Sequence, residues 1–277
     1  MIGSKLSPSY WQLAGAVSLW GKMPCRGDFI RRNLLFEQEQ GLEEWAREKR
    51  SILSPSEEIS QPRKTKGIPW HSLDYRAKQQ QQSVDSLGFG HPGQPWCFIL
   101  PPQSVPFAPD RYLIGVWMDS SDKVGREYPL IMIQMVARRW IGQYFAFHAE
   151  QPCEWLFNAS RIIANSIHAQ EWENDHPTNR EEFDHIGLLL AKLNALWSLY
   201  APTWLNFLGK RISPPNLEAH QLKDLIDPPH PDDPVRNLNG VRFLPWSDWP
   251  DCVMQPSAQG FFWQQDLHGR FIGAIRA

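Results

Sequence analysis

Three short apolar runs lie in the middle of the chain and predict buried β-strands. Each is rich in β-branched and aromatic residues and is bounded by Pro, Gly or Asp; they cover Trp96–Leu100, Tyr112–Met118 and Leu130–Val136. The last two are nearly continuous rather than alternating. Such runs are typical of strands that are covered on both faces, so they predict a sheet that is buried on both sides.

Shorter apolar segments near the two ends predict further elements. Leu13–Trp20 is interpreted as a first buried strand, closed by a loop over residues 21–27. Towards the C-terminus, short strands are predicted at Val241–Leu244, Val253–Met254 and Phe261–Trp263. After them, Leu267, Phe271 and Ile275 have the spacing of one face of a terminal helix.

Helical periodicity is clearest over Phe183–Tyr200. The apolar stripe there follows the 3.6-residue repeat through Phe183, Ile186, Leu190, Leu193 and Trp197. Another helix is predicted through Leu42–Lys49, where Glu43 and Arg47 form a favourable i,i+4 pair. The remaining predicted helices are Trp140–Phe147, Trp155–Ile167 and Leu217–Ile226.

The order of these elements predicts an α/β protein. Strand and helix, then strands, helices, and again strands and helix, favour a three-layer α/β/α sandwich with helices on both faces of a central, largely antiparallel or mixed sheet. We expect one domain over residues 1–277, with a core over residues 13–140 and a helical, proline-rich part over residues 140–277. The polar, glutamine-rich stretch 51–95 is predicted to be a mobile connection.

Composition narrows the classes of function. A formal net charge of −2 disfavours nucleic acid and anionic membranes as partners. The four cysteines are scattered without a CxxC pair, which indicates free thiols in a reducing compartment. Leu13–Trp20 is too short to span a membrane and precedes a poor signal-peptidase site, so a cytoplasmic location is predicted. No phosphate-binding loop, HExxH or GxSxG motif occurs.

Two charged, glycine-containing motifs stand at strand ends. The first is W-G-K-M-P-C-R-G-D-F-I-R-R at residues 20–32, and the second is G-V-W-M-D-S-S-D-K-V-G-R-E-Y-P-L at residues 115–130. Gly27 and Gly125 suit tight loops, because glycine readily adopts a positive φ. We expect the two loops to lie side by side, coupled through Arg26, Asp28, Asp122 and Arg126, with Arg31, Arg32 and Lys123 facing a partner.

These motifs resemble those of the TagF (ImpM) family. The first is similar to the family's aromatic-G-K-[LM]-P-S-R-G-D-F-[VI]-R-R, the second to G-V-x-M-x-S-x-D-x-V-G-R-x-[FY]-P-L, and Pro95–Leu100 takes the place of its S-P-x-W-R-F-A-L strand. The chain departs from the pattern at Cys25, where the family has Ser, and at Asp119, where Pro is common. The stretch 51–95 is longer than usual, and the family's WW-type signature is not clear at residues 245–249.

The resemblance implies a non-enzymatic accessory protein of a bacterial type VI secretion system. Family members are post-translational repressors or modulators of secretion, associated with the FHA-domain scaffold protein of the apparatus. No catalytic residue, cofactor or metal is therefore expected. The structural or interaction residues that the motifs imply are Arg26, Gly27, Asp28, Phe29, Arg31, Arg32, Ser120, Asp122, Gly125, Arg126 and Pro129.

Two other functions remain open at this point. One is a structural or assembly component of the same apparatus without a switching role. The other is a hydrolase that uses Asp122, Arg126 and a histidine. The residues do not decide between repressor and assembly factor, nor do they indicate the oligomeric state.

Overall fold

The computed structural model describes residues 13–53, 93–142, 154–175, 184–200, 246, 248–255, 259–265 and 271–277. Most of the predicted mobile connection at 51–95, the predicted helix at Leu217–Ile226 and the predicted strand at Val241–Leu244 lie outside these residues.

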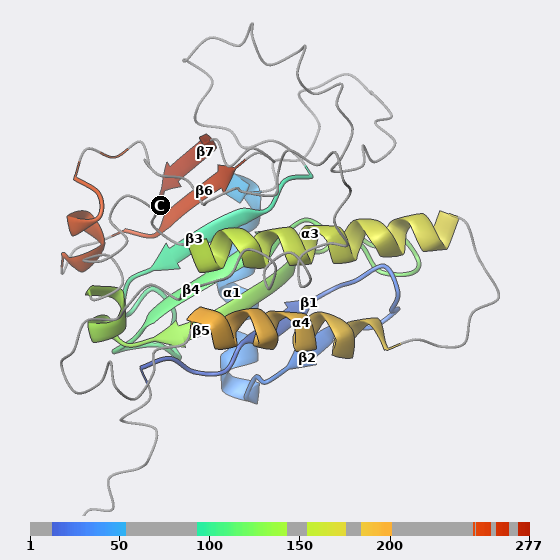
Figure 1. Ribbon diagram of the computed structural model, residues 1–277, viewed down its shortest axis with the longest axis horizontal. Helices are drawn as coiled ribbons and strands as arrows, with labels where there is room; N and C mark the ends of the chain where they lie inside the picture. Colours follow the sequence, from blue (N-terminus) through green and yellow to red (C-terminus); the bar gives the residue numbers. More distant parts are fainter. Residues whose placement is uncertain are drawn as a thin grey trace, which may run out of the picture.

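The centre of the molecule is a seven-stranded open sheet in the order β2-β1-β5-β4-β3-β6-β7 (Figure 1). Every neighbouring pair in this order is antiparallel. The predicted α/β class with a largely antiparallel sheet is thus confirmed. The strands are β1 Ser18–Gly21, β2 Ile30–Arg32, β3 Trp96–Leu100, β4 Tyr112–Met118, β5 Leu130–Val136, β6 Phe261–Gln265 and β7 Phe271–Arg276.

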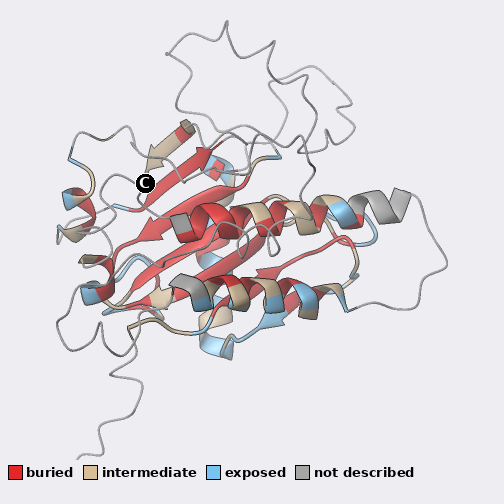
Figure 2. Ribbon diagram, viewed as in Figure 1, coloured by how far each residue is buried: buried red, intermediate tan, exposed pale blue. Residues whose placement is uncertain are grey.

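The three central strands have the bounds that their apolar runs predict, and they are almost wholly buried (Figure 2). Their alternate residues enter two different apolar clusters. In β3, Trp96, Phe98 and Leu100 belong to one cluster, whereas Cys97 and Ile99 belong to the other. Because successive side chains of a strand point to opposite faces, a continuous apolar run supplies both clusters at once.

The helices contribute to the two clusters separately. Helix α1 (Phe36–Leu53) supplies Leu42, Trp45 and Ala46 to the cluster that holds Trp96 and Phe98. Helices α3 (Glu154–Asp175) and α4 (His185–Tyr200) supply residues to the cluster that holds Cys97 and Ile99. We call these the α1 cluster and the α3–α4 cluster.

Helix α4 begins two residues after the predicted start. Its first turn is capped by Asp184, whose Oδ1 accepts a hydrogen bond from the Gly187 amide at 3.0 Å. A carboxylate at this position satisfies one of the amides that the helix itself leaves unpaired. The apolar stripe defines the face of the helix, but the cap decides where it begins.

The predicted terminal helix is wrong, because Phe271–Arg276 forms edge strand β7. Phe271 and Ile275 are partners of Gln265 and Phe262 in β6. Residues four apart lie on the same side of a helix and also on the same side of a strand, so their spacing alone does not separate the two. Pairing with β6 decides in favour of the strand.

Two smaller elements also differ from the prediction. Val253–Met254 is not a strand but part of the 3-10 turn η7 (Asp251–Met254), where the Tyr112 hydroxyl donates to the Val253 carbonyl at 3.0 Å. In contrast, Ile30–Arg32, where no strand was predicted, forms edge strand β2. Only Ile30 is buried in this strand, and exposed arginines are typical of a sheet edge.

Candidate interaction site

The two sequence motifs meet where β1 ends and β5 begins. Gly21, the last residue of β1, is the register partner of Leu130, the first residue of β5. The loop that leaves β1 (residues 22–29, the first loop) therefore starts beside the loop that enters β5 (residues 119–129, the second loop). The predicted adjacency of the two motifs follows from this strand pairing.

Gly21 permits an unusually close approach of the two backbones. Its φ is 129°, and a Cβ placed on it would lie 2.0 Å from the carbonyl oxygen of Pro129. The next amide, that of Lys22, donates to the same oxygen at 3.4 Å. Any larger side chain at position 21 would push the first loop away from the second.

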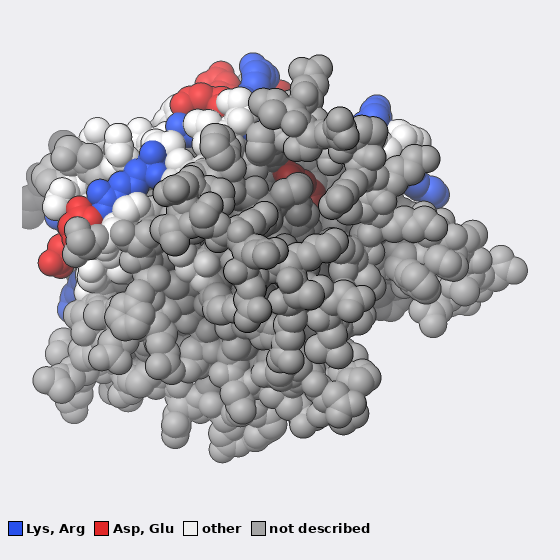
Figure 3. Space-filling view, turned by 90° about the horizontal axis from the view of Figure 1, so that it is seen from above, with Lys and Arg blue, Asp and Glu red and all other residues white. Residues whose placement is uncertain are grey.

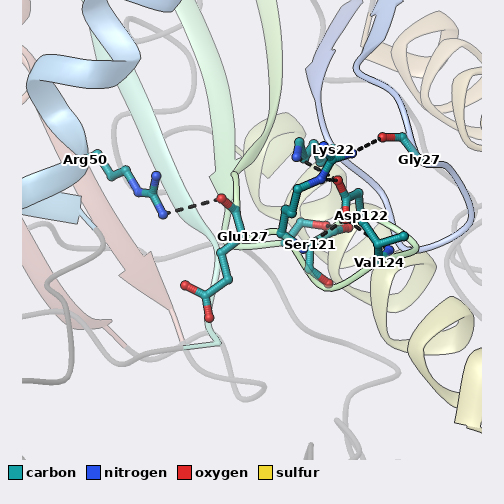
Figure 4. Close-up of polar contacts among 9 residues, drawn as sticks. Lys22, Gly27, Arg50, Ser121, Asp122, Val124 and Glu127 are labelled. Carbon is teal, nitrogen blue, oxygen red and sulfur yellow. Dashed lines mark hydrogen bonds and ion pairs between the residues drawn. The ribbon is translucent and has the colours of Figure 1, made fainter.

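Asp122 is the polar centre of the site (Figure 4). Its Oδ2 accepts hydrogen bonds from Lys22 Nζ at 2.7 Å and from Arg126 Nε at 2.6 Å. Its Oδ1 accepts from the amides of Val124 at 3.1 Å and Arg126 at 2.9 Å. The Asp122 side chain is 0% exposed, and that of Lys22 is 9% exposed. Four donors, two of them charged, thus converge on one buried carboxylate.

The second loop is a tight hairpin around this carboxylate. The Asp122 amide donates to the Arg126 carbonyl at 3.1 Å, and the Gly125 amide donates back to the Asp122 carbonyl at 2.9 Å. Gly125 has a φ of 84°, the positive value expected for it. Gly27, for which the sequence predicts the same, is not among the residues with a positive φ.

Contacts between the loops hold the first loop on the second. The Arg126 guanidinium reaches across and donates to the Gly27 carbonyl at 2.8 Å. The Lys123 amide donates to the Arg26 carbonyl at 2.9 Å. Groups of the second loop therefore bind backbone carbonyls of the first, and such contacts are not encoded in any residue pattern of the first loop.

Burial by itself would raise the pKa of Asp122. Hydrogen bonds from the Lys22 side chain, from the amide and side chain of Arg126 and from the Val124 amide lower the pKa by more than burial raises it. The pKa of Asp122 is consequently held well below its usual range. A carboxylate that is fully ionised and accepts four hydrogen bonds is a poor proton acceptor. This geometry argues against Asp122 as the general base of a hydrolase.

Three aromatic rings link the site to the α1 cluster. Trp20, Phe29 and Tyr128 lie with ring centroids 5.0–5.5 Å apart. Lys22 Nζ lies 5.4 Å from the centre of the Phe29 ring, and the Arg50 guanidinium of α1 lies 5.6 Å from the centre of Tyr128. The rings and the cations on them place both loops near the end of α1.

The predicted site residues occupy three kinds of position. Ser120, Asp122 and Pro129 are buried, and Gly27 is partly buried. Arg31 and Arg32 lie on edge strand β2 and face solvent, where Arg31 Nε pairs with Glu39 of α1 at 2.6 Å. The rest are exposed loop residues: Arg26, Asp28, Phe29, Gly125 and Arg126.

The coupling across the loops differs from the expectation in its partners. Asp122 and Arg126 do pair, but Arg26 and Asp28 are exposed, and neither forms an ion pair with any residue that the structure describes. Lys22, which the sequence reasoning missed, is the cation that crosses to Asp122. The sequence feature that could have identified Lys22 is its position directly after the end of a buried strand, closer to the core than Arg26.

The described part of the chain offers neither a metal-binding cluster nor a membrane-spanning helix. There, no group of three or more His, Cys, Asp and Glu side chains is arranged to hold a metal ion. None of the helices in that part has the length and apolarity needed to cross a bilayer.

Comparison with known proteins confirms the resemblance that the motifs indicate. Residues 75–177 match the family model of the TagF N-terminal domain, which is type VI secretion system-associated. The match covers β3, β4, β5 and all of α3, together with the second motif; the first motif lies outside it. No curated protein matches the chain.

Among solved structures, PA0076 from Pseudomonas aeruginosa PAO1 is 18% identical, with a TM-score of 0.33. The similarity covers 64% of this chain and 62% of the chain in that structure.

Proposed function

We propose that this protein, which carries a TagF N-terminal domain, is a non-enzymatic regulator of a bacterial type VI secretion system. It acts in the cytoplasm as a repressor, by binding the FHA-domain scaffold protein of the apparatus. The observation that carries the proposal is the family match over residues 75–177, which includes the second loop of the candidate site. The local chemistry supports a binding role, because the buried carboxylate orders the loops and is saturated with donors.

The proposal includes a three-layer arrangement of one domain. It is supported by the division of the helices between the two clusters, with α1 in one and α3 and α4 in the other. In such an arrangement, the two loops extend from the strand ends at the rim of the sheet. They and strand β2 present Arg31, Arg32 and Lys123 to the scaffold, and the saturated Asp122 holds the loops in a fixed shape.

The binding step is tested by co-purification of the protein with the FHA-domain scaffold of the same secretion system. We expect wild type to retain the scaffold, and Arg32→Ala to retain less of it at an unchanged melting temperature. Arg47→Ala is the matched control, because Arg47 is exposed on α1, where it forms an ion pair with Glu43. Absence of wild-type binding would contradict the proposed partner.

The regulatory step is tested by measuring secretion in a deletion strain. A repressor predicts more secretion after deletion, whereas a structural or assembly component predicts loss of secretion. Complementation with wild type restores the original level in either case, so the direction of the change distinguishes the two. An activity lost on addition of a chelator would instead favour the hydrolase hypothesis.

A further inference from the structure

The exposed rim of the two loops carries three cationic side chains. The loops, residues 22–29 and 119–129, together contain four Lys or Arg and four Asp or Glu. The cation Lys22 and the anion Asp122 are buried against each other and neutralise one another. The exposed charged side chains at the loop junction are then two anions, Asp28 and Glu127, and three cations, Arg26, Lys123 and Arg126, which we call the cationic ridge.

The ridge is assembled by backbone contacts between the two loops. Arg26 and Lys123 start from adjacent positions, since the Lys123 amide donates to the Arg26 carbonyl at 2.9 Å. Arg126 is brought to the same place by its hydrogen bond to the Gly27 carbonyl at 2.8 Å. Three cations from two segments about a hundred residues apart thus share one rim.

Arg126 is oriented rather than free. Its Nε is held by buried Asp122 and one terminal nitrogen by Gly27, yet its side chain is 64% exposed. A guanidinium has five N–H donors, and contacts with described residues use two of them. The remaining donors are presented to solvent in a fixed geometry, which lowers the entropy cost of binding a carboxylate.

The surroundings of the ridge indicate the size and kind of ligand. Val124, which follows Lys123 at the tip of the second loop, is 69% exposed and offers an apolar contact in the same loop. Asp28 and Glu127 are also exposed in these loops, so the ridge is not an extended surface of positive charge alone. The described part of the face in Figure 3 also carries both cationic and anionic side chains. A short ligand fits this pattern better than an extended polyanion such as nucleic acid.

We infer that the cationic ridge binds a short acidic segment of a protein partner. Two or three carboxylates contact Arg26, Lys123 and Arg126, and an apolar residue of the segment packs on Val124. Asp122 is a positioning residue, which acts through Arg126 without touching the segment. The inference rests on the proposed function only in taking a protein as the source of the segment.

The inference is tested with a dye-labelled hexaglutamate peptide, whose binding to the full chain is followed by fluorescence anisotropy. Hexaglutamine is the uncharged control, and a ten-nucleotide oligo-dT is the nucleic-acid control. We expect saturable binding of hexaglutamate at low salt that weakens as salt screens the charges. Hexaglutamine should not bind, and oligo-dT should bind less tightly than hexaglutamate.

Variants locate the binding on the ridge. Arg126→Gln should weaken hexaglutamate binding about 3-fold, and Lys123→Gln combined with Arg126→Gln should weaken it about 10-fold. Arg47→Gln removes a similarly exposed cation of α1 and should leave the affinity unchanged. A thermal melt of each variant verifies that it is folded. Lys22 still pairs with Asp122 in the two ridge variants, so they retain the buried ion pair.

The outcomes separate this inference from the proposed function. Equal hexaglutamate affinity of wild type and the double variant, no saturable binding by wild type, or tighter binding of oligo-dT would each overturn it. The same variants are then tested for retention of the FHA-domain scaffold. If wild type does not bind the scaffold, the proposed function fails, while the peptide measurement still decides whether the ridge binds acidic segments.

Discussion

Among the residues that the structure describes, two aspartate–arginine pairs have sharply different surroundings. Asp122 pairs with Arg126 and Lys22 at the motif loops, and its side chain is fully buried. Asp248 pairs with Arg276 at the C-terminal edge of the sheet, and its side chain is 44% exposed. The first carboxylate also accepts two backbone amides of its own loop.

The arginines also do different things in the two pairs. Arg126 bridges two loops and leaves donors in solvent, whereas Arg276 lies over the rings of Trp246 and Phe261, with its guanidinium 5.3 Å and 5.2 Å from their centres. A hydrogen bond from Arg276 lowers the pKa of Asp248, against the effect of burial. The Asp122–Arg126 pair fixes the backbone of the two loops, whereas the arginine of the Asp248–Arg276 pair covers two aromatic rings. The comparison shows that the neighbours of an ion pair, rather than its chemistry, decide its role.

The largest expected effect comes from adding a methyl group at Gly21, where the two loops approach most closely. In Gly21→Ala the new methyl group would overlap the Pro129 carbonyl and force a φ of 129° on an alanine. We expect a loss of at least about 4 kcal/mol in the free energy of unfolding, measured by urea denaturation. Gly27→Ala is the control, because a Cβ there meets nothing within 4 Å. Equal stability of the two variants would contradict the close approach.

The next effect is expected from Asp122→Asn. The substitution leaves Lys22, which is 9% exposed, facing an amide instead of a carboxylate, and it weakens the hold on Arg126. The buried cation that loses its carboxylate partner is therefore Lys22, because Arg126 is exposed. We expect a melting temperature lower by about 5 °C. Asp28→Asn, in the exposed part of the first loop, should melt like wild type; a similar drop in both variants would contradict the assignment.

Acid should abolish the stability advantage of wild type over the Asp122→Asn variant. The pKa of Asp122 is lowered in the folded protein relative to about 3.9 in the unfolded chain, so its stabilisation is complete above that value. It is lost as the pH falls from about 4 towards the folded pKa. The melting temperatures of the two proteins should differ by a constant amount between about pH 5 and 7 and converge below about pH 4. A difference that grows in acid would contradict the buried pair.

The smallest effect is expected from Asp248→Asn. Its partner Arg276 remains packed on Trp246 and Phe261 without the ion pair, and solvent screens the interaction of the exposed carboxylate. We expect a melting temperature within about 2 °C of wild type. Arg276→Ala removes the packing as well and should cost more. If Asp248→Asn were as harmful as Asp122→Asn, the contrast between the two pairs would be wrong.

The sequence by itself determined the elements whose local signal is strong. The central strands β3, β4 and β5 have the bounds predicted from their apolar runs, because a strand that feeds two clusters requires apolar residues throughout. The existence of helix α1, predicted over Leu42–Lys49 and observed over Phe36–Leu53, and the apolar face of α4 follow from their periodicity. The family resemblance was also readable, since it rests on residue identities in a fixed order.

Only the tertiary structure decided the features that depend on partners distant in the chain. Phe271 and Ile275 have a spacing compatible with either a helix or a strand, and pairing with β6 selects the strand. Lys22 and Asp122 are a hundred residues apart and meet because Gly21 pairs with Leu130, a register that no local pattern specifies. The charges of the site were visible in the sequence. Their burial was not, because burial is set by which strand ends come together.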